Sequence, residues 1–296
     1  MEQLIPNPWQ FVVNGLAMSA FYCLFAVGMS LVFGVMKIVN MAHGELYMLG
    51  AYLVWLGLSI AEKFAVPMIP AFFVVLVVAI IIVGGVGVAI ERAVFRRLHG
   101  NVIAGYMASL GLVYILQCST GHLFGFKDKS APNLFATNFK IAGASLSAHR
   151  VVTVIIAGIL MSLLWIFLNK TNLGRGVRAS SQDSEAASLQ GIGSHRMATL
   201  VMCAGAVLAA AAGGLVGTTF LISPYMGTTV LWKAFIITIV GGMGSIGGAI
   251  VAAFVFGFLD NFVSTVTDPR MVILVDVVIM LVILAFRPQG LLGREK

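Results

Sequence analysis

Apolar residues run along the chain in eight long stretches separated by short polar connections. The stretches cover residues 11–36, 41–60, 68–90, 102–124, 151–168, 197–220, 234–262 and 272–286. About twenty apolar residues are enough for a helix to cross a bilayer, and backbone at that depth must form its hydrogen bonds within its own segment. The pattern predicts an all-α integral membrane protein, a polytopic helical bundle in which residues 1–296 form a single transmembrane domain.

Composition agrees with this interpretation. Of 296 residues, 60% are hydrophobic and 10% are charged, and the mean hydropathy is +1.03, which excludes an ordinary soluble domain. The net charge of +7 does not indicate a nucleic-acid partner, because Lys and Arg concentrate in loops. Basic loops at 91–100 and 169–196 and the basic tail at 287–296 are expected to be cytoplasmic. The loop at 125–150 is also basic, but its place in the alternation of spans puts it outside.

The seventh stretch is interrupted by glycine. With alternating crossings, eight ordinary spans would leave the basic tail on the wrong side, so one segment must depart from a simple crossing. The sequence "GGMGSIGG" at 241–248 places five glycines within eight residues. Glycine weakens a helix by about 1 kcal/mol per residue. We expect a broken or re-entrant element here, the alternative being an ordinary helix whose small residues allow close packing.

Polar residues also interrupt the second stretch, in "NMAHGELYML". Intramembrane Glu is costly and normally faces the bundle interior, a partner or water. On one helix His43 and Tyr47 share a face, whereas Glu45 projects about 200° from His43, so the two would not touch. Either Glu45 lines a transport path, or the group caps a helix start at the membrane surface, which is the expectation for His43. Candidate path residues, taken from the interrupted segments of both halves, are Asn40, His43, Glu45, Tyr47, Gly241, Gly242, Gly244 and Ser245.

Three further charged residues lie in apolar surroundings. Asp260 falls near a segment end and is expected to be interfacial or a capping residue. Lys233 is expected at the membrane surface. Asp276 lies within the last span, where a snorkelling or ion-paired structural role is favoured over contact with a substrate.

The loop at 169–196 contains a candidate docking element. Residues 177–190 are good helix formers, and Gly191 is placed to end the helix, so we expect a short helix outside the membrane. Small residues let another surface approach closely, although an inert surface helix is an equal alternative on physical grounds. The candidate docking residues are Arg178, Asp183, Glu185, Ala186, Ala187 and Gly191.

This loop carries a resemblance. Glu185, Ala186 and Ala187 followed by Gly191 are similar to the EAAxxxG coupling motif of ATP-binding cassette (ABC) importer permeases. Together with "GMSLVFGVMKIVNMAHGELYMLGAY", "GGMGSIGGAIVAAFVFGFLDNF" and the terminal "RPQGLLGR", the chain resembles LivH-type branched-chain amino acid permeases over nearly its whole length.

The resemblance implies partners. They are a second, LivM-like permease subunit, two cytoplasmic ABC ATPase subunits, an extracytoplasmic substrate-binding protein and the bilayer of the bacterial inner membrane. The docking residues would then belong to the ATPase-coupling element. The chain has no GxxxxGK[ST] sequence, so we expect ATP to be hydrolysed by partner subunits and no cofactor to be bound by this chain.

The substrate is not determined by the permease sequence. Branched-chain or other small amino acids are expected, and Glu45 would accept the ammonium of such a zwitterion. Urea, amides and aromatic carboxylates are alternatives within the same class. A passive channel with a glycine-rich filter is a rival that would not need the cytoplasmic helix, and an intramembrane enzyme would need a catalytic set that His43 and Glu45 do not supply.

Overall fold

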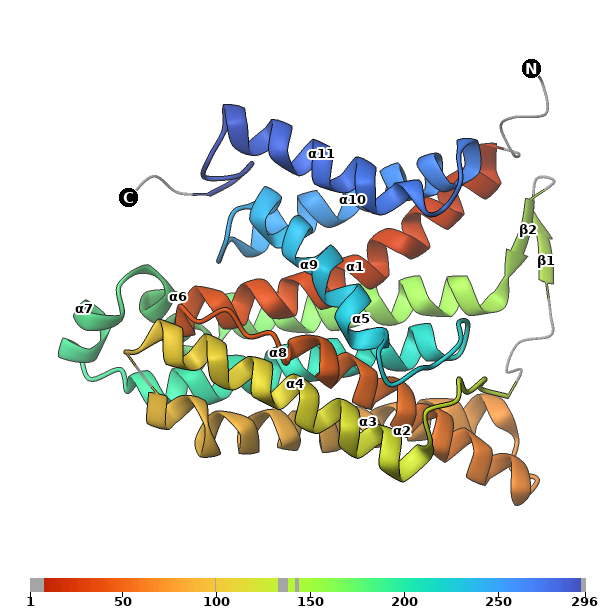
Figure 1. Ribbon diagram of the computed structural model, residues 1–296, viewed down its shortest axis with the longest axis horizontal. Helices are drawn as coiled ribbons and strands as arrows, with labels where there is room; N and C mark the ends of the chain where they lie inside the picture. The colour runs from red at the N-terminus through yellow and green to blue at the C-terminus, as the bar shows by residue number, and fades with distance from the viewer. Residues whose placement is uncertain (1–7, 99, 133–137, 142–143, 294–296) are drawn as a thin grey trace.

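The computed structural model describes residues 8–293 except 99, 133–137 and 142–143 (Figure 1). Its helices are α1 (Pro8–Met36), α2 (His43–Lys63), α3 (Met68–Ala93), the 3₁₀ turn η1 (Phe95–Leu98), α4 (Val102–Phe124), α5 (Ala148–Lys170), α6 (Asn172–Gln182), α7 (Ser184–Leu189), α8 (Ser194–Gly217), α9 (Met226–Gly241), α10 (Ile246–Val266) and α11 (Met271–Phe286). Strands β1 (Asn138–Ile141) and β2 (Ala144–Ser147) form one antiparallel hairpin. In this described part of the chain, seven helices are long and apolar enough to cross a membrane. The all-α polytopic membrane fold is confirmed.

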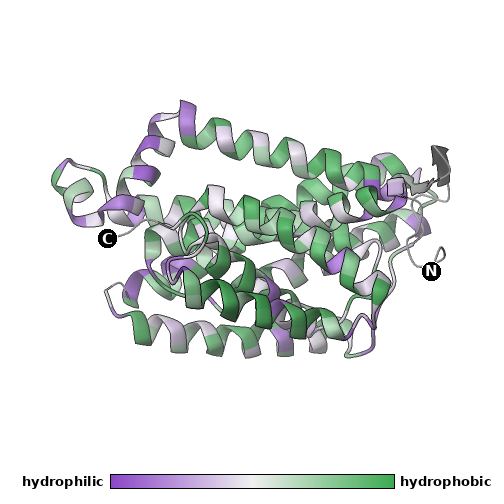
Figure 2. Ribbon diagram, turned by 90° about the horizontal axis from the view of Figure 1, so that it is seen from above, coloured by the Kyte–Doolittle hydropathy of each residue, from purple (hydrophilic) through white to green (hydrophobic). Residues whose placement is uncertain are grey.

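The long helices run roughly parallel to the long axis of the molecule. Figure 2 shows hydrophobic residues along their middles and hydrophilic residues gathered toward the two ends. One end carries η1, α6, α7 and residues 287–293, and the other carries the β hairpin (Figure 1). The described parts of the three basic segments expected to be cytoplasmic therefore lie at one end. Arg96 of η1 donates a hydrogen bond to Thr199, near the start of α8, at this end. We call this the α7 end.

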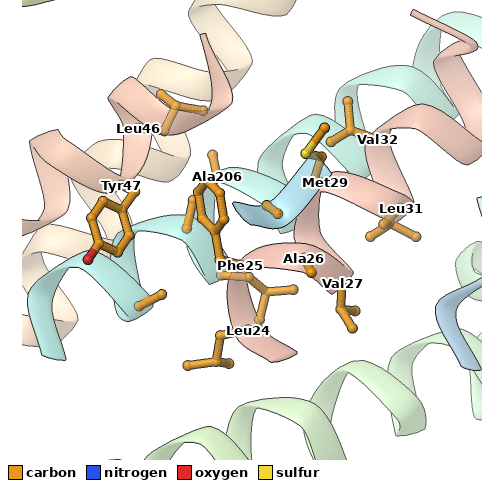
Figure 3. Close-up of a cluster of buried hydrophobic side chains, with 14 of the residues drawn as sticks. Leu24, Phe25, Ala26, Val27, Met29, Leu31, Val32, Leu46, Tyr47 and Ala206 are labelled. Carbon is orange, nitrogen blue, oxygen red and sulfur yellow. The ribbon is translucent and has the colours of Figure 1, made fainter. Parts of the chain in front are cut away.

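Helix α1 lies at the centre of the bundle and packs against α5, α8, α9 and α10. Figure 3 shows its apolar side chains, including Phe25, which meets Tyr47 of α2 with ring centroids 5.5 Å apart. Helices α2 and α8 approach until their backbones touch, because a Cβ on Gly213 would lie 1.9 Å from the Tyr47 carbonyl oxygen. Small residues thus provide the close packing that helices in a lipid environment depend on.

Two helices begin inside the bundle. After α1 ends at Met36, residues 37–42 turn back, and α2 starts at His43 beside Gly28. Gly28 lies eight residues before the end of α1, or about 12 Å at 1.5 Å per residue. Helix α9 also starts inside, because a Cβ on Gly44 would lie 2.3 Å from the Gly227 carbonyl oxygen. The first turns of α2 and α9 therefore meet within the membrane-spanning layer.

The glycine-rich segment is broken, as expected. Helices α9 and α10 are antiparallel neighbours joined by residues 242–245, where Gly242 and Gly244 have φ of +100° and +84°. Their backbones touch, since a Cβ on Gly248 would lie 1.8 Å from the Gly241 carbonyl oxygen. The stretch expected as one interrupted segment at 234–262 is thus two helices, starting at Met226. The added helix places the C-terminal tail at the same end as the other basic loops.

The expected cytoplasmic helix at 177–190 is wrong in its bounds. The chain forms α6 and α7 instead, with Asp183 in extended conformation between them. Helix α6 is not freely hydrated, because Gly174 and Val177 are buried where it packs against α5 and α8. Only α7 projects from the bundle as a short exposed helix (Figure 1).

Candidate functional site

Glu45 lies where three helices meet. Its carboxyl group is in the first turn of α2, and the residue is 1% exposed. The Nε2 of Gln117, on α4, donates to Oε1 of Glu45 at 2.9 Å and to Oγ1 of Thr228, on α9, at 2.9 Å. Oε2 of Glu45 is buried and has no hydrogen-bond partner in the described part of the chain. The position is inside the bundle, which contradicts the alternative of a cap at the membrane surface.

Two glycines make this position possible. A Cβ on Gly227 would lie 3.1 Å from Cδ of Glu45 and 2.5 Å from the Gly44 carbonyl oxygen. Side chains at either glycine would separate α2 from α9. The positive ends of two helix dipoles therefore lie beside one carboxyl group.

His43 lies on the opposite side of α2, so the expectation that it does not touch Glu45 is confirmed. Its ring packs on Phe25 with centroids 5.0 Å apart, in space left by Gly28 and Gly205. The residue is fully buried among α1, α2 and α8. The expectation of an interfacial His43 is wrong, because residues 37–42 carry the start of α2 into the bundle.

Asn40 and Tyr47 have local packing roles. The Asn40 Oδ1 accepts a hydrogen bond from the Ala42 backbone at 3.0 Å, just before α2 starts. Tyr47 packs by its ring on Phe25 and by its backbone on Gly213. Asn40 also donates from Nδ2 to the sulfur of Met202 on α8 at 3.7 Å. Glu45 is the member of this motif whose side chain accepts a hydrogen bond from an amide on another membrane helix.

The glycine-rich loop does not join Glu45. Gly244 packs on Gly34 near the end of α1, and a Cβ on Gly242 would lie 2.6 Å from the Gly293 backbone nitrogen. Ser245 caps α10 by accepting a hydrogen bond from the Gly248 backbone. Gly241 is fourteen residues beyond Gly227, or about 21 Å along α9. The two sets of candidate path residues thus lie at different depths, and this loop packs against the C-terminal segment.

Sequence reasoning missed Gln117 and Thr228. The available signal for Gln117 was an amide in the middle of the apolar stretch at 102–124. Thr228 lies outside every stretch that the hydropathy pattern marked, because α9 begins earlier than expected.

The three charged residues found in apolar surroundings form one buried cluster, a pairing that the sequence did not predict. Lys233 of α9 lies 2.6 Å from the carboxylate of Asp260 on α10 and is ion-paired with Asp276 on α11. Tyr22 of α1 donates a hydrogen bond to Asp260 at 2.6 Å. The interfacial positions expected for Lys233 and Asp260 are therefore wrong, and the ion-paired role expected for Asp276 is confirmed.

The candidate docking residues divide into two groups. Asp183 caps α7, its Oδ1 accepting hydrogen bonds from the backbones of Glu185 and Ala186 at 2.9 Å each. Glu185 and Ala186 are exposed, whereas Ala187 is buried. Gly191 ends the turn with φ +80°.

Arg178 and Leu189 depart from the expected picture. The guanidinium of Arg178 donates to Asn169 of α5, so it turns toward the bundle. Leu189 of α7 is 87% exposed and was not singled out from the sequence. The outward face of α7 therefore combines one carboxylate with small and apolar side chains.

Comparison with known proteins agrees with this architecture. The family described as "Branched-chain amino acid transport system / permease component" matches residues 11–286. The chain is 31% identical to the high-affinity branched-chain amino acid transport system permease protein BraD of Pseudomonas aeruginosa, covering 97% of this chain and 96% of that one. It is 30% identical to the permease protein LivH of Escherichia coli, with the same coverage.

Among solved structures, the fold is similar to "PsaBC from Streptococcus pneumoniae in complex with Fab". The TM-score is 0.52 at 14% identity, over 95% of this chain and 94% of that one. This likeness concerns the fold alone. The family match and the two full-length relatives together show that the chain belongs to the branched-chain amino acid transport system permease family.

Proposed function

We propose that this chain is the permease subunit of an ATP-driven importer in the inner membrane and that its substrates are branched-chain or other small amino acids. A second, LivM-like permease would complete the translocation path, and an extracytoplasmic binding protein would deliver the substrate. ATP would be bound and hydrolysed by two partner ATPase subunits. The names of the full-length relatives support the substrate class.

The unpaired Oε2 of Glu45 carries the substrate proposal. A buried carboxylate oxygen without a partner costs free energy unless another group satisfies it for part of the cycle. An amino acid offers an ammonium group with three donors, which suits this acceptor. Gln117 donates to the other carboxylate oxygen and also to the hydroxyl of Thr228, so Oε2 is left for the substrate when α2 and α9 separate.

Coupling would run from α7 through packed helices. Helix α6 follows α5 so closely that a Cβ on Gly174 would lie 2.1 Å from the Phe167 carbonyl oxygen. Gly176 packs on Met197 of α8, and α8 touches α2 at Gly50 and Gly213. Closing of the ATPases on α7 would thus shift α5 and α8 and, with them, the start of α2.

Glu45→Gln tests the role of this carboxyl group. The amide preserves shape and accepts the hydrogen bond from Gln117 through its own oxygen, but it removes the negative charge. We expect uptake of leucine by the assembled importer to fall at least tenfold, which is about 1.4 kcal/mol, with the complex intact. Glu62→Gln, at the exposed end of the same helix, is the matched control. Unimpaired uptake and ATPase coupling in Glu45→Gln would remove Glu45 from the mechanism.

A further inference from the structure

A cavity of about 710 Å³ lies between α5 and α10, toward the α7 end of the bundle. Its α5 wall includes Met161 and Trp165, and its α10 wall includes Ile246, Gly247 and Ile250. Helix α1 packs against both α5 and α10. The residues that line the cavity do not belong to α2, α4 or α9, the helices of Glu45, Gln117 and Thr228.

The polar groups of the cavity collect at one end. Asn169 is near the end of α5, Arg178 is on α6, and the first turn of α10 presents the positive end of its dipole. Ser162, farther up α5, already donates its hydroxyl hydrogen to the Gly158 carbonyl oxygen. The remainder of the lining is apolar, so the cavity is hydrophobic along most of its length and has a positively charged group at one end.

The guanidinium of Arg178 has more N–H donors than the described protein residues use. A guanidinium carries five N–H donors in a rigid fork that suits phosphate oxygens. In the described residues, its one hydrogen-bond acceptor is Asn169. An anion at this end would also lie near the first turn of α10, where helix N-termini favour phosphate.

A transmembrane helix fits the space poorly. One turn of helix rises 5.4 Å with a diameter of about 10–12 Å, so it fills roughly 400–600 Å³. The cavity is open on one side, and the space that it encloses matches one to two turns of a spanning helix of about 20 residues. A flexible acyl chain with an anionic head matches both the volume and the distribution of charge.

We propose that a phospholipid of the leaflet at the α7 end occupies this cavity, with one acyl chain between α5 and α10 and its phosphate on Arg178. The lipid would join the helix that leads into α6 and α7 to the helix that follows the glycine-rich loop. Arg178 would then serve as a headgroup ligand.

Gly247 offers a direct way to fill the cavity. A Cβ there meets no atom within 4 Å, and its φ is not positive, so the protein itself can accept Gly247→Phe. Gly85→Phe is the matched control, because Gly85 is also helical, exposed and free of neighbours, but lies on α3 outside the cavity. Arg178→Gln is a second variant that leaves the cavity open and removes the cation.

The probe is phosphatidylglycerol with a diazirine in its acyl chain, in vesicles of phosphatidylethanolamine and phosphatidylglycerol containing the protein in its isolated complex. We expect light-induced adducts on 161–169 and 246–250 in the wild type and Gly85→Phe, and their loss in Gly247→Phe. Arg178→Gln should reduce them about tenfold, the value of a charge-assisted hydrogen bond.

Three results would overturn the proposal. One is equal labelling of Gly247→Phe and the wild type. Another is labelling of the cavity peptides no greater than that of exposed α3. The third is occupation of the cavity by a partner subunit, detected as protein–protein crosslinks from the same peptides in place of lipid adducts.

Discussion

Lys233 joins two buried carboxylates that come from different helices. Its side chain is 9% exposed, and those of Asp260 and Asp276 are 1% and 0% exposed. Removing one partner from a buried ion pair costs about 3–5 kcal/mol, because the remaining charge is left uncompensated. The cluster therefore ties α9, α10 and α11 together.

Lys233→Met tests this role. It leaves two carboxyl groups without their cation, so we expect the melting temperature of the purified complex to fall markedly. Asp276→Asn leaves one ammonium with one carboxylate and should lower it less. A Lys233→Met protein with the same melting temperature as the wild type would contradict a structural role for the cluster.

The sequence allowed Glu45 to be singled out but not its partners. The cost of a carboxyl group in an apolar stretch is local information, whereas Gln117 lies 72 residues away and Lys233 pairs over 27 and 43 residues. Such contacts depend on which helices become neighbours. Hydropathy alone does not contain that information.

Among the helices and their connections, the loop between α9 and α10 requires glycine. Gly242 has φ +100°, where an L side chain costs about 1–2 kcal/mol, and a Cβ would also meet the Gly293 backbone at 2.6 Å. We expect Gly242→Ala to lower the melting temperature and the yield of folded protein. Gly247→Ala, with open space around it, is the control. Equal stability of the two variants would show that the loop is not held as described.

The cap of α7 can be removed without touching its outward face. Asp183→Ala deletes the acceptor for two backbone amides and should destabilise this short helix by about 1 kcal/mol. We expect substrate-stimulated ATPase activity to fall while the permease remains folded. Asp183→Asn preserves a good cap and should retain coupling. If the Asp183→Ala importer keeps the substrate-stimulated ATPase activity of the wild type, then coupling does not require an ordered α7.

At this scale the sequence predicted long helices well and short ones poorly. The bounds at 102–124 agree with α4, because polar residues at both ends of a long apolar stretch fix where a spanning helix begins and ends. Residues 177–190 contain good helix formers, yet Asp183 interrupts them by capping the following turn. The start of α9 was missed because residues 221–233 are mixed in polarity. Gly227 is buried only because α9 packs against Gly44 of α2.

The whole molecule is a bundle in which two helices start within the membrane-spanning layer and meet at Gly44 and Gly227. The all-α membrane fold and the common end of the basic segments followed from composition and charge. The inward turn of residues 37–42 did not, since it depends on glycines in α1 and α8 that leave room for His43. Separation of α2 from α9 is the movement that would expose Glu45.

Uphill transport in vesicles tests the central claim most directly, which is that work from ATPase partners reaches the path through α7. We expect vesicles containing this chain alone to accumulate no leucine against a gradient. Vesicles with the assembled importer, binding protein and ATP should accumulate it, and scrambling residues 185–191 should abolish this. Accumulation by the chain alone, or full pumping by the scrambled variant, would contradict the account.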